Sequence, residues 1–127
     1  MACVLVAEDD PEMRRLVVDA LVKDGHTVLS AEDGGGMVML IAQIFHADHS
    51  LDRIDVIVSD MRMPVSNGLE QLERIAEAGW NIPSILMTAF GDDDTRRRAA
   101  HIGATLLEKP LALADLRLAV RSLTARP

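Results

Sequence analysis

The sequence has no tyrosine, only 2% aromatic residues and a single cysteine, Cys3. A lone cysteine excludes an intramolecular disulfide. Because the first residues also lack a basic, signal-like pattern, we expect a reducing, cytoplasmic compartment. No apolar run approaches the roughly 20 residues that a membrane-spanning helix requires. With so few aromatic residues, Leu, Val, Ile, Ala and Met must fill the core of this 49% hydrophobic chain.

Basic residues are also in deficit, with 13 Lys and Arg against 20 Asp and Glu and a net charge of −7. Nonspecific nucleic-acid binding relies on clustered Lys and Arg, so we expect no direct contact with nucleic acid. The one basic run, "RRR" at 96–98, follows "DDD" at 92–94. That order is typical of a helix with acids in its first turn, and we interpret the arginines as a solvated helix face.

Five short apolar segments, rich in Val, Leu, Ile and Thr, recur along the 127 residues. They are 3–7, 26–31, 55–60, 83–89 and 104–109. Several are continuously apolar, as expected of strands that are covered on both faces. We therefore expect one domain, 1–127, with an α/β fold in which a parallel sheet carries helices on both faces.

Apolar residues at helical spacing predict the helices between these strands. The three clearest stripes are Met13, Leu16, Val17, Ala20 and Leu21, then Leu69, Leu72, Ile75 and Ala76, then Leu113, Leu116, Val120 and Leu123. A weaker helix is predicted over 92–102. Gly25, the "AGW" at 78–80 and Gly103 are expected to end the helices that precede them.

Polar side chains follow four of the five predicted strands. They are Glu8, Asp9 and Asp10 after the first, Asp60 after the third, Thr88-Ala89 after the fourth and Lys109-Pro110 after the fifth. Because the carboxyl ends of parallel strands share one edge of the sheet, we expect these groups to meet on one rim. Crowded carboxylates repel each other unless a cation intervenes, and an all-oxygen site suits Mg²⁺ (or Mn²⁺).

A carboxylate in such a site can also act as a nucleophile toward phosphorus. Asp60 is our candidate because it lies alone at its strand end, facing the acid cluster. Phosphoryl transfer mainly needs positioning and charge neutralisation, which a metal, Lys109 and Thr88 would supply from different sides. Asp10 before Pro11 also fits a helix N-cap with proline at the first helical position.

Four stretches together resemble the motifs of response-regulator receiver domains, in order and in separation. They are "LVAEDDPEMRR" at 5–15, "VSDMRMPVSNGLEQL" at 58–72, "MTAFGD" at 87–92 and "GATLLEKP" at 103–110. The resemblance covers nearly the whole chain. It implies a flavodoxin-like, doubly wound (βα)5 fold with strand order 2-1-3-4-5.

The resemblance also implies a function in two-component phosphorelay signalling. A sensor histidine kinase would donate a phosphoryl group to Asp60, and a face made of the fourth helix, fifth strand and fifth helix would signal to an effector domain or protein. The domain would hydrolyse its own acyl phosphate without being a stand-alone enzyme.

The implied site residues fall into three groups. The metal ligands would be Glu8, Asp9, Asp60 and the backbone carbonyl of Arg62, which leaves Asp10 as a cap. The phosphoryl contacts would come from Thr88, Ala89 and Lys109, and the peptide between Lys109 and Pro110 would be cis.

The switch position departs from the family pattern, because Leu106 stands where Tyr or Phe is usual. A movement of Thr88 on phosphorylation could be transmitted to the output face in two ways. Either Leu106 makes a smaller movement, or Phe90 supplies the aromatic ring. Asn67, in place of the frequent Asp, is expected to cap the next helix normally.

The segment 34–55 is longer than its family counterpart, and from 37 to 45 only Gln43 is polar. Three glycines before this run leave its start poorly specified. Either residues 46–54 fold back over the second apolar face, or an apolar patch stays exposed for a partner or a homodimer. His46 and His49 could hold a metal on one helix face, but without further ligands nearby we interpret them as surface residues.

Two rival functions remain. A receiver that binds partners without phosphorylation is favoured by Leu106 but disfavoured by the intact set of acids, Thr88 and Lys109. A Mg²⁺-dependent phosphatase with an aspartyl-phosphate intermediate would carry a second Asp two residues after Asp60, where this chain has Arg62. Both a stand-alone receiver and a piece of a longer regulator are compatible with the sequence.

Overall fold

The computed structural model describes residues 2–46, 54–63, 67–89 and 91–125. Strands and helices alternate along the chain: β1 (Cys3–Ala7), α1 (Pro11–Lys23), β2 (Thr27–Ala31), α2 (Gly34–His46), β3 (Val56–Asp60), α3 (Gly68–Glu77), β4 (Ser84–Thr88), α4 (Asp93–His101), β5 (Thr105–Glu108) and α5 (Leu113–Thr124). The strands form one parallel sheet in the order β2-β1-β3-β4-β5. The predicted fold class, strand order and five β-α units are confirmed.

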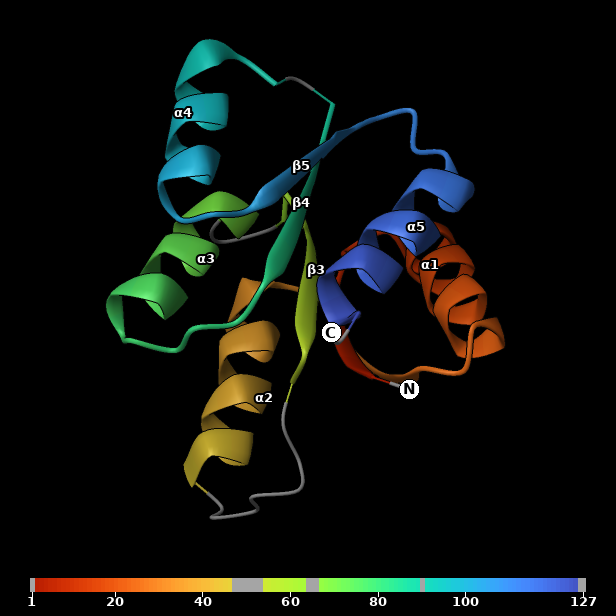
Figure 1. Cartoon of the computed structure of the whole chain (residues 1–127). Helices are drawn as coiled ribbons and strands as arrows, with labels where there is room; N and C mark the ends of the chain where they lie inside the picture. The colour runs from red at the N-terminus through yellow and green to blue at the C-terminus, as the bar shows by residue number, and fades with distance from the viewer. Residues whose placement is uncertain (1, 47–53, 64–66, 90, 126–127) are drawn as a thin grey trace.

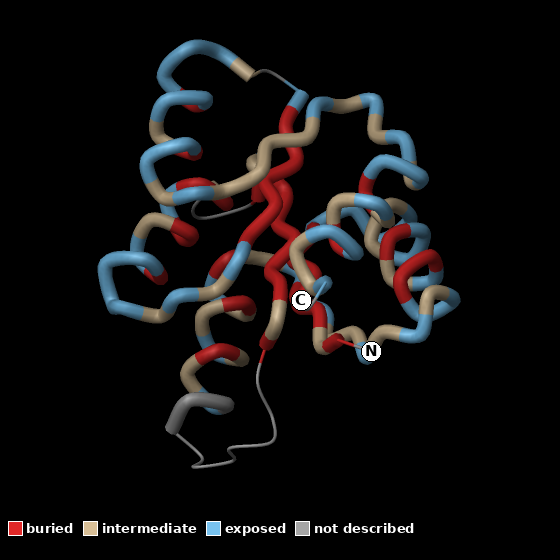
Figure 2. The backbone as a smooth tube through the Cα atoms, viewed as in Figure 1, coloured by how far each residue is buried: buried red, intermediate tan, exposed pale blue. Residues whose placement is uncertain are grey.

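The helices cover both faces of the sheet, with α1 and α5 on one side and α2, α3 and α4 on the other (Figure 1). Adjacent residues of β1 therefore enter different cores: Leu5 packs with α2 and α3, whereas Val4 and Val6 pack with α1 and α5. Figure 2 shows the buried residues running through the central strands. Continuous apolar strands follow from this arrangement, because no face of the central strands meets water.

The helix boundaries agree with local signals in the sequence. The Asp10 side chain accepts a hydrogen bond from the Glu12 N–H, with Pro11 at the first helical position, and Asn67 caps α3 through the Glu70 N–H. Gly25, Gly79 and Gly103 follow α1, α3 and α4 with φ of 91°, 81° and 73°. Glycine adopts this left-handed conformation without the steric cost of a Cβ, so each predicted helix end is confirmed.

Two details of the predicted helix faces are wrong. Leu16 was expected to face the core, but it is 53% exposed, because α1 turns Val17 and Leu21 toward the sheet and leaves Leu16 on its flank. Ala76 of α3 is exposed in the same way, while Leu69, Leu72 and Ile75 are buried.

Helix α2 begins earlier than its apolar run suggested. The three glycines form its first turn, where the Asp33 side chain accepts a hydrogen bond from the Gly36 N–H (2.7 Å) and the Asp33 carbonyl accepts one from the Met37 N–H (3.1 Å). The start of α2 is therefore specified by Asp33 rather than left open by the glycines. Met37 and Ile41 are buried, whereas Met39 is 63% exposed. Of the segment 46–54, for which a fold-back was predicted, residues 47–53 including His49 lie outside the described residues, as does the side chain of His46, while Ile54 is buried.

None of the helices that the structure describes is both long enough and apolar enough to cross a lipid bilayer.

Candidate functional site

The acidic end of β1 is built by the strand ladder and the helix that follows. The Glu8 N–H donates to the Ala31 carbonyl (3.1 Å), which extends the pairing of β1 with β2 by one residue. The chain then turns into α1 at the Asp10 cap, and the Asp10 N–H donates to Glu8 Oε2 (3.3 Å). Glu8 is consequently held inside the protein while Asp9 is exposed.

Glu8, Asp9 and Asp60 come together at the carboxyl ends of β1 and β3. One carboxylate oxygen from each lies within 4.8 Å of the other two. The Glu8 and Asp60 side chains are almost fully buried, at 1% and 5% exposure. The predicted grouping of the first-strand acids with Asp60 is therefore present in the structure, while the side chain of Asp10 serves as the helix cap.

This cluster fits a divalent cation. Glu8 Oε1 is buried and has no hydrogen-bond partner among the described residues. Burial, and then the charge of Asp60, raise the pKa of Glu8 to about 7, and they outweigh the lowering effect of the hydrogen bond from the Asp10 N–H and of the Lys109 charge. Three carboxylates at this spacing offer oxygen ligands, which Mg²⁺ prefers.

Lys109 faces the two buried acids from the end of β5. Its Nζ lies 2.7 Å from Asp60 Oδ1 and 3.8 Å from Glu8 Oε1. Partial burial disfavours the ammonium, but the hydrogen bond and the negative charge of Asp60 outweigh it and raise the pKa of Lys109 above its ordinary value. Lys109 therefore stays charged beside Asp60, and its peptide bond to Pro110 is cis, as predicted.

Thr88 is the last residue of β4 and is buried, and Ala89 follows it as an exposed residue on the rim. The Lys109 N–H donates to the Thr88 carbonyl (2.7 Å), so the backbone of β4 is tied directly to the residue whose amine contacts Asp60. Arg62 follows Asp60 by two residues, in the connection to α3, with an exposed side chain. The role of its carbonyl stays a prediction.

Gly68 was not singled out as a site residue, yet the start of α3 packs there against the backbone of Asp60. Its N–H donates to the Met61 carbonyl (2.8 Å), and a Cβ at this position would overlap the Asp60 carbonyl oxygen and lie 2.6 Å from Ser59 Oγ. The start of α3 can therefore approach Asp60 only if residue 68 is glycine. The Asn-Gly pair before an apolar helical stripe was the available signal.

The predicted switch region brings β5 against the connection between β4 and α4. Leu106 is half-buried and packs in the core on the α3 and α4 side. A Cβ at Gly91 would lie 2.8 Å from Glu108 Oε1 and 3.4 Å from Leu106 Cδ2, so this connection is packed on β5. Phe90, the other predicted readout, lies outside the described residues.

Arg96 and Arg97 of the "RRR" run are exposed, as predicted for a solvated face, but the run also pairs with acids of neighbouring elements. Arg98 Nε lies 3.0 Å from Glu73 Oε2 on α3, and Arg96 Nη2 lies 2.7 Å from Glu108 Oε1 on β5. Within the part of the chain that the structure describes, Arg97 pairs only with Asp94 of its own helix, at 3.5 Å. Two of the three arginines thus attach α4 to its neighbours, which spacing alone could not reveal.

Comparison with known proteins agrees with this geometry. The family model described as response regulator receiver domain matches residues 4–121. The chain is 32% identical over 124 residues to the response regulator MprA of Mycolicibacterium vanbaalenii, covering 97% of this chain and 50% of that protein. It is 28% identical over 119 residues to sporulation initiation phosphotransferase F of Bacillus subtilis, covering 93% of this chain and 90% of that protein.

Solved structures show the same architecture. The receiver domain of the Francisella response regulator 1452 superposes with a TM-score of 0.84 at 26% identity, covering 97% of this chain and 96% of that one. The chemotaxis protein CheY4 of Vibrio cholerae superposes with a TM-score of 0.82 at 26% identity, covering 97% and 98%. The chain spans about half the length of several curated relatives that it matches, including MprA.

Proposed function

The chain belongs to the response regulator receiver domain family of two-component signalling, and on that premise we propose that Asp60 is its phosphoacceptor. The observation that carries the proposal is the position of Asp60. It is buried, within 4.8 Å of the Glu8 and Asp9 carboxylates, and in contact with the Lys109 amine at 2.7 Å. A carboxylate placed between a cation site and a lysine has partners for both its own charge and that of an incoming phosphoryl group.

In the proposed reaction a carboxylate oxygen of Asp60 attacks the phosphorus of a phosphohistidine on a sensor kinase. A new P–O bond to Asp60 forms as the P–N bond breaks, and the departing imidazole keeps the electron pair of that bond and takes up a proton. Lys109, which holds Asp60 Oδ1 before the reaction, can then pair with a phosphoryl oxygen. The buried, hydrogen-bonded backbone around Asp60 keeps the carboxylate oriented during transfer.

We assign a Mg²⁺ site (or Mn²⁺) to Glu8, Asp9, Asp60 and the backbone carbonyl of Arg62. A bound ion would neutralise the acid cluster and the oxygens of the transferring group. Support comes from Glu8 Oε1, which is buried without a hydrogen bond from the described residues, and from the close spacing of the three carboxylates. The same site would allow water to hydrolyse the acyl phosphate, which would end the signal.

The proposed output runs from Thr88 to the face formed by α4, β5 and α5. Thr88 and Ala89 would contact the phosphoryl group, and the connection after them packs on Glu108 and Leu106 of β5. Glu108 in turn pairs with Arg96 of α4. A movement of Thr88 would therefore shift α4 and β5 even though Leu106 is not aromatic. An effector domain, an effector protein or a second copy of the chain could bind the shifted face.

For this function the protein would be located in the cytoplasm, where a sensor kinase can phosphorylate it. Cys3 would be reduced there. The second candidate, a receiver that works without phosphorylation, is favoured by Leu106 alone. A phosphoryl analogue such as fluoroberyllate distinguishes the two, because it should shift the NMR signals of α4 and β5 under the proposed function and leave them unchanged under the alternative.

The direct test is phosphorylation with acetyl phosphate and Mg²⁺, followed by intact-protein mass spectrometry. Wild type should gain one phosphoryl group, and Asp60→Asn should gain none. Asp19→Asn, which changes an exposed aspartate of α1, is the matched control and should behave as wild type. Labelling that persists in Asp60→Asn contradicts the assignment.

A further inference from the structure

Arg14 connects helix α1 to the acidic end of β1. Its Nη1 donates to the backbone carbonyl of Glu8 at 2.8 Å, and its Nη2 lies 3.7 Å from Glu32 Oε1 in the connection between β2 and α2. The Arg14 side chain is 20% exposed, whereas Glu32 is 81% exposed. The bond to the Glu8 carbonyl is therefore the sheltered one, and the pair with Glu32 is a solvated contact of small energetic value.

The bond from Arg14 completes the set of contacts that hold Glu8. The Glu8 N–H donates to the Ala31 carbonyl, and Glu8 Oε2 accepts from the Asp10 N–H. Arg14 binds the backbone carbonyl of Glu8, while the buried Glu8 Oε1 accepts no hydrogen bond from any described residue and lies in the acid cluster, 3.8 Å from Lys109 Nζ. Arg14 thus restrains the backbone from which this side chain projects, while the Asp10 N–H restrains the carboxylate itself.

The same peptide group also leads to Asp9. The Glu8 carbonyl belongs to the peptide bond between Glu8 and Asp9, so a guanidinium bound to that oxygen restrains both residues together. The pairing of β1 with β3 ends at Ala7, so the carbonyl of Glu8 lies one residue beyond it. Arg14 thus takes the place that a neighbouring strand fills for the residues before it.

We infer that Arg14 is a positioning residue for the cation site, which fixes the Glu8–Asp9 peptide so that both carboxylates meet Asp60. The inference rests on the proposed function, since it assigns Arg14 a role in that same site. Residues that orient metal ligands from outside the coordination shell commonly change metal affinity by about 10-fold or more when they are replaced.

Whether Mg²⁺ affinity falls or rises when Arg14 is replaced distinguishes a positioning role from a purely electrostatic one. Arg14 is a cation close to a site for a cation, so its charge alone opposes Mg²⁺ binding. Loss of that charge would strengthen binding if electrostatics were the whole effect. Loss of the hydrogen bond to the Glu8 carbonyl would weaken binding, because the two carboxylates would no longer be held in place.

The test compares Arg14→Gln with Arg15→Gln by isothermal titration calorimetry with Mg²⁺ and by the rise of Tm with Mg²⁺ concentration. Arg15 is the matched control, since it is an exposed neighbour on α1 and its replacement changes the net charge by the same amount. Arg14→Gln should raise the Kd for Mg²⁺ by about 10-fold. Arg15→Gln should leave the Kd unchanged or slightly lower.

Two further variants keep the inference open to contradiction if Arg14→Gln folds poorly. Arg14→Lys can still donate one hydrogen bond to the Glu8 carbonyl and should recover part of the affinity. Glu32→Gln removes the solvated pair and should leave the Kd unchanged. Wild-type or tighter Mg²⁺ binding by Arg14→Gln overturns the inference, as does a loss of affinity in Arg15→Gln or Glu32→Gln equal to that in the Arg14 variants.

The outcome for Arg14 can be distinguished from the outcome for Asp60. Wild type that binds Mg²⁺ but accepts no phosphoryl group contradicts the proposed phosphoacceptor and leaves the Mg²⁺ comparison valid. Wild type that is phosphorylated on Asp60, with Mg²⁺ binding indifferent to Arg14, contradicts the positioning role alone. Wild type without Mg²⁺ binding contradicts both.

Discussion

Lys109 Nζ lies 2.7 Å from Asp60 Oδ1, and the N–H of the same lysine donates to the carbonyl of Thr88. One residue therefore contacts the proposed phosphoacceptor through its side chain and the proposed phosphoryl sensor through its backbone. This link joins Asp60 at the end of β3 to the end of β4, and the connection that follows β4 packs on Glu108 of β5, which pairs with Arg96 of α4.

Replacement of Lys109 should separate charge neutralisation from metal binding. Lys109→Ala removes the cation that would pair with the phosphoryl group, so the initial rate of phosphoryl incorporation should fall by roughly 10²- to 10³-fold. Mg²⁺ should bind at least as tightly, because a positive charge has left the cluster. Lys23→Ala, at the exposed end of α1, is the control and should keep the wild-type rate. A similar loss in both variants would contradict a specific role for Lys109.

Mg²⁺ affinity should rise with pH and level off above about pH 7. Burial and the charge of Asp60 raise the pKa of Glu8 from 4.5 to about 7, so below that pH the metal must displace a proton from the carboxyl group. Calorimetry across this range checks the slope. An affinity for Mg²⁺ that does not change with pH contradicts the placement of Glu8 in the site.

The same pKa has a consequence for the metal-free protein. The folded state holds the Glu8 proton to a higher pH than the unfolded state does, so this group's contribution to the free energy of unfolding falls as pH rises from 4.5 to about 7. Glu8→Gln keeps the size of the side chain without its charge. It should flatten that pH dependence in urea unfolding and weaken Mg²⁺ binding. A variant that keeps the wild-type slope rules Glu8 out as its source.

Gly68→Ala should destabilise the protein and impair phosphorylation, because the added Cβ overlaps the Asp60 carbonyl oxygen, a backbone atom that cannot move without shifting the site. Overpacking of this kind costs about 1–3 kcal/mol or more in the free energy of unfolding. Gly35→Ala is the control of opposite sign. It lies in α2, where a Cβ would only touch Asp33 Oδ1 at 3.5 Å, and should stabilise the helix by up to about 1 kcal/mol. Equal effects of the two changes would contradict the close approach.

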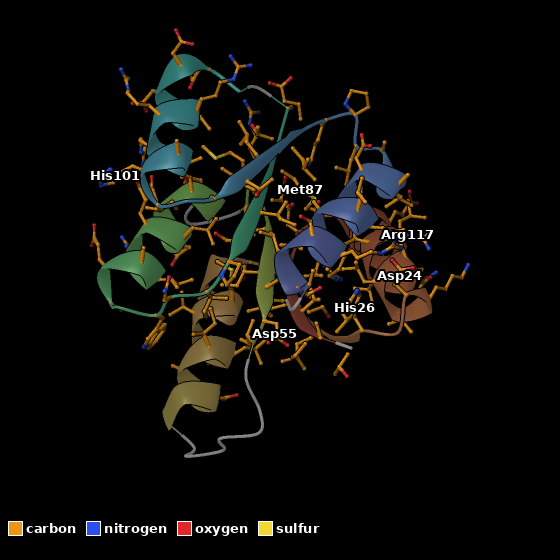
Figure 3. The ribbon with its side chains drawn as sticks, in the orientation of Figure 1. Asp24, His26, Asp55, Met87, His101 and Arg117 are labelled. Atoms are coloured by element: carbon orange, nitrogen blue, oxygen red, sulfur yellow. The ribbon has the colours of Figure 1, made fainter. Side chains whose placement is uncertain are left out.

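The ion pair between Asp24 at the end of α1 and Arg117 of α5 should contribute to the free energy of unfolding, and that contribution should depend on pH. Figure 3 shows the two side chains together, and Arg117 Nε lies 2.9 Å from Asp24 Oδ2. This bond lowers the pKa of Asp24, so its stabilising contribution is present above the ordinary value of 3.8 and is lost as pH falls through the lowered pKa. Arg117→Gln should reduce stability in urea near neutral pH and much less in strong acid. Arg121→Gln, which is exposed, should have a smaller effect, and a loss of equal size at both pH values would contradict the ion pair.

Much of this architecture could be predicted for two reasons. Apolar residues recur with different periods in strands and in helices, and the carboxyl ends of strands in a parallel sheet share one edge. Asp60 and Lys109 are far apart in the chain, yet the shared edge of the strand ends was enough to predict that they lie close together. The orientation of Leu16 could not be predicted, because an amphipathic stripe leaves the rotation of a helix uncertain by about one residue. Arg14 and Arg15 are alike in the sequence, and only the folded position of the Glu8 carbonyl distinguishes them.

The decisive measurement locates the phosphoryl group on the protein and so tests Asp60 as the phosphoacceptor. After reaction with acetyl phosphate and Mg²⁺, borohydride reduction converts an aspartyl phosphate into homoserine, which tandem mass spectrometry can locate. Homoserine is expected at position 60, dependent on Mg²⁺ and absent from Asp60→Asn. Homoserine at another aspartate, or a phosphorylated protein with none at position 60, would contradict it.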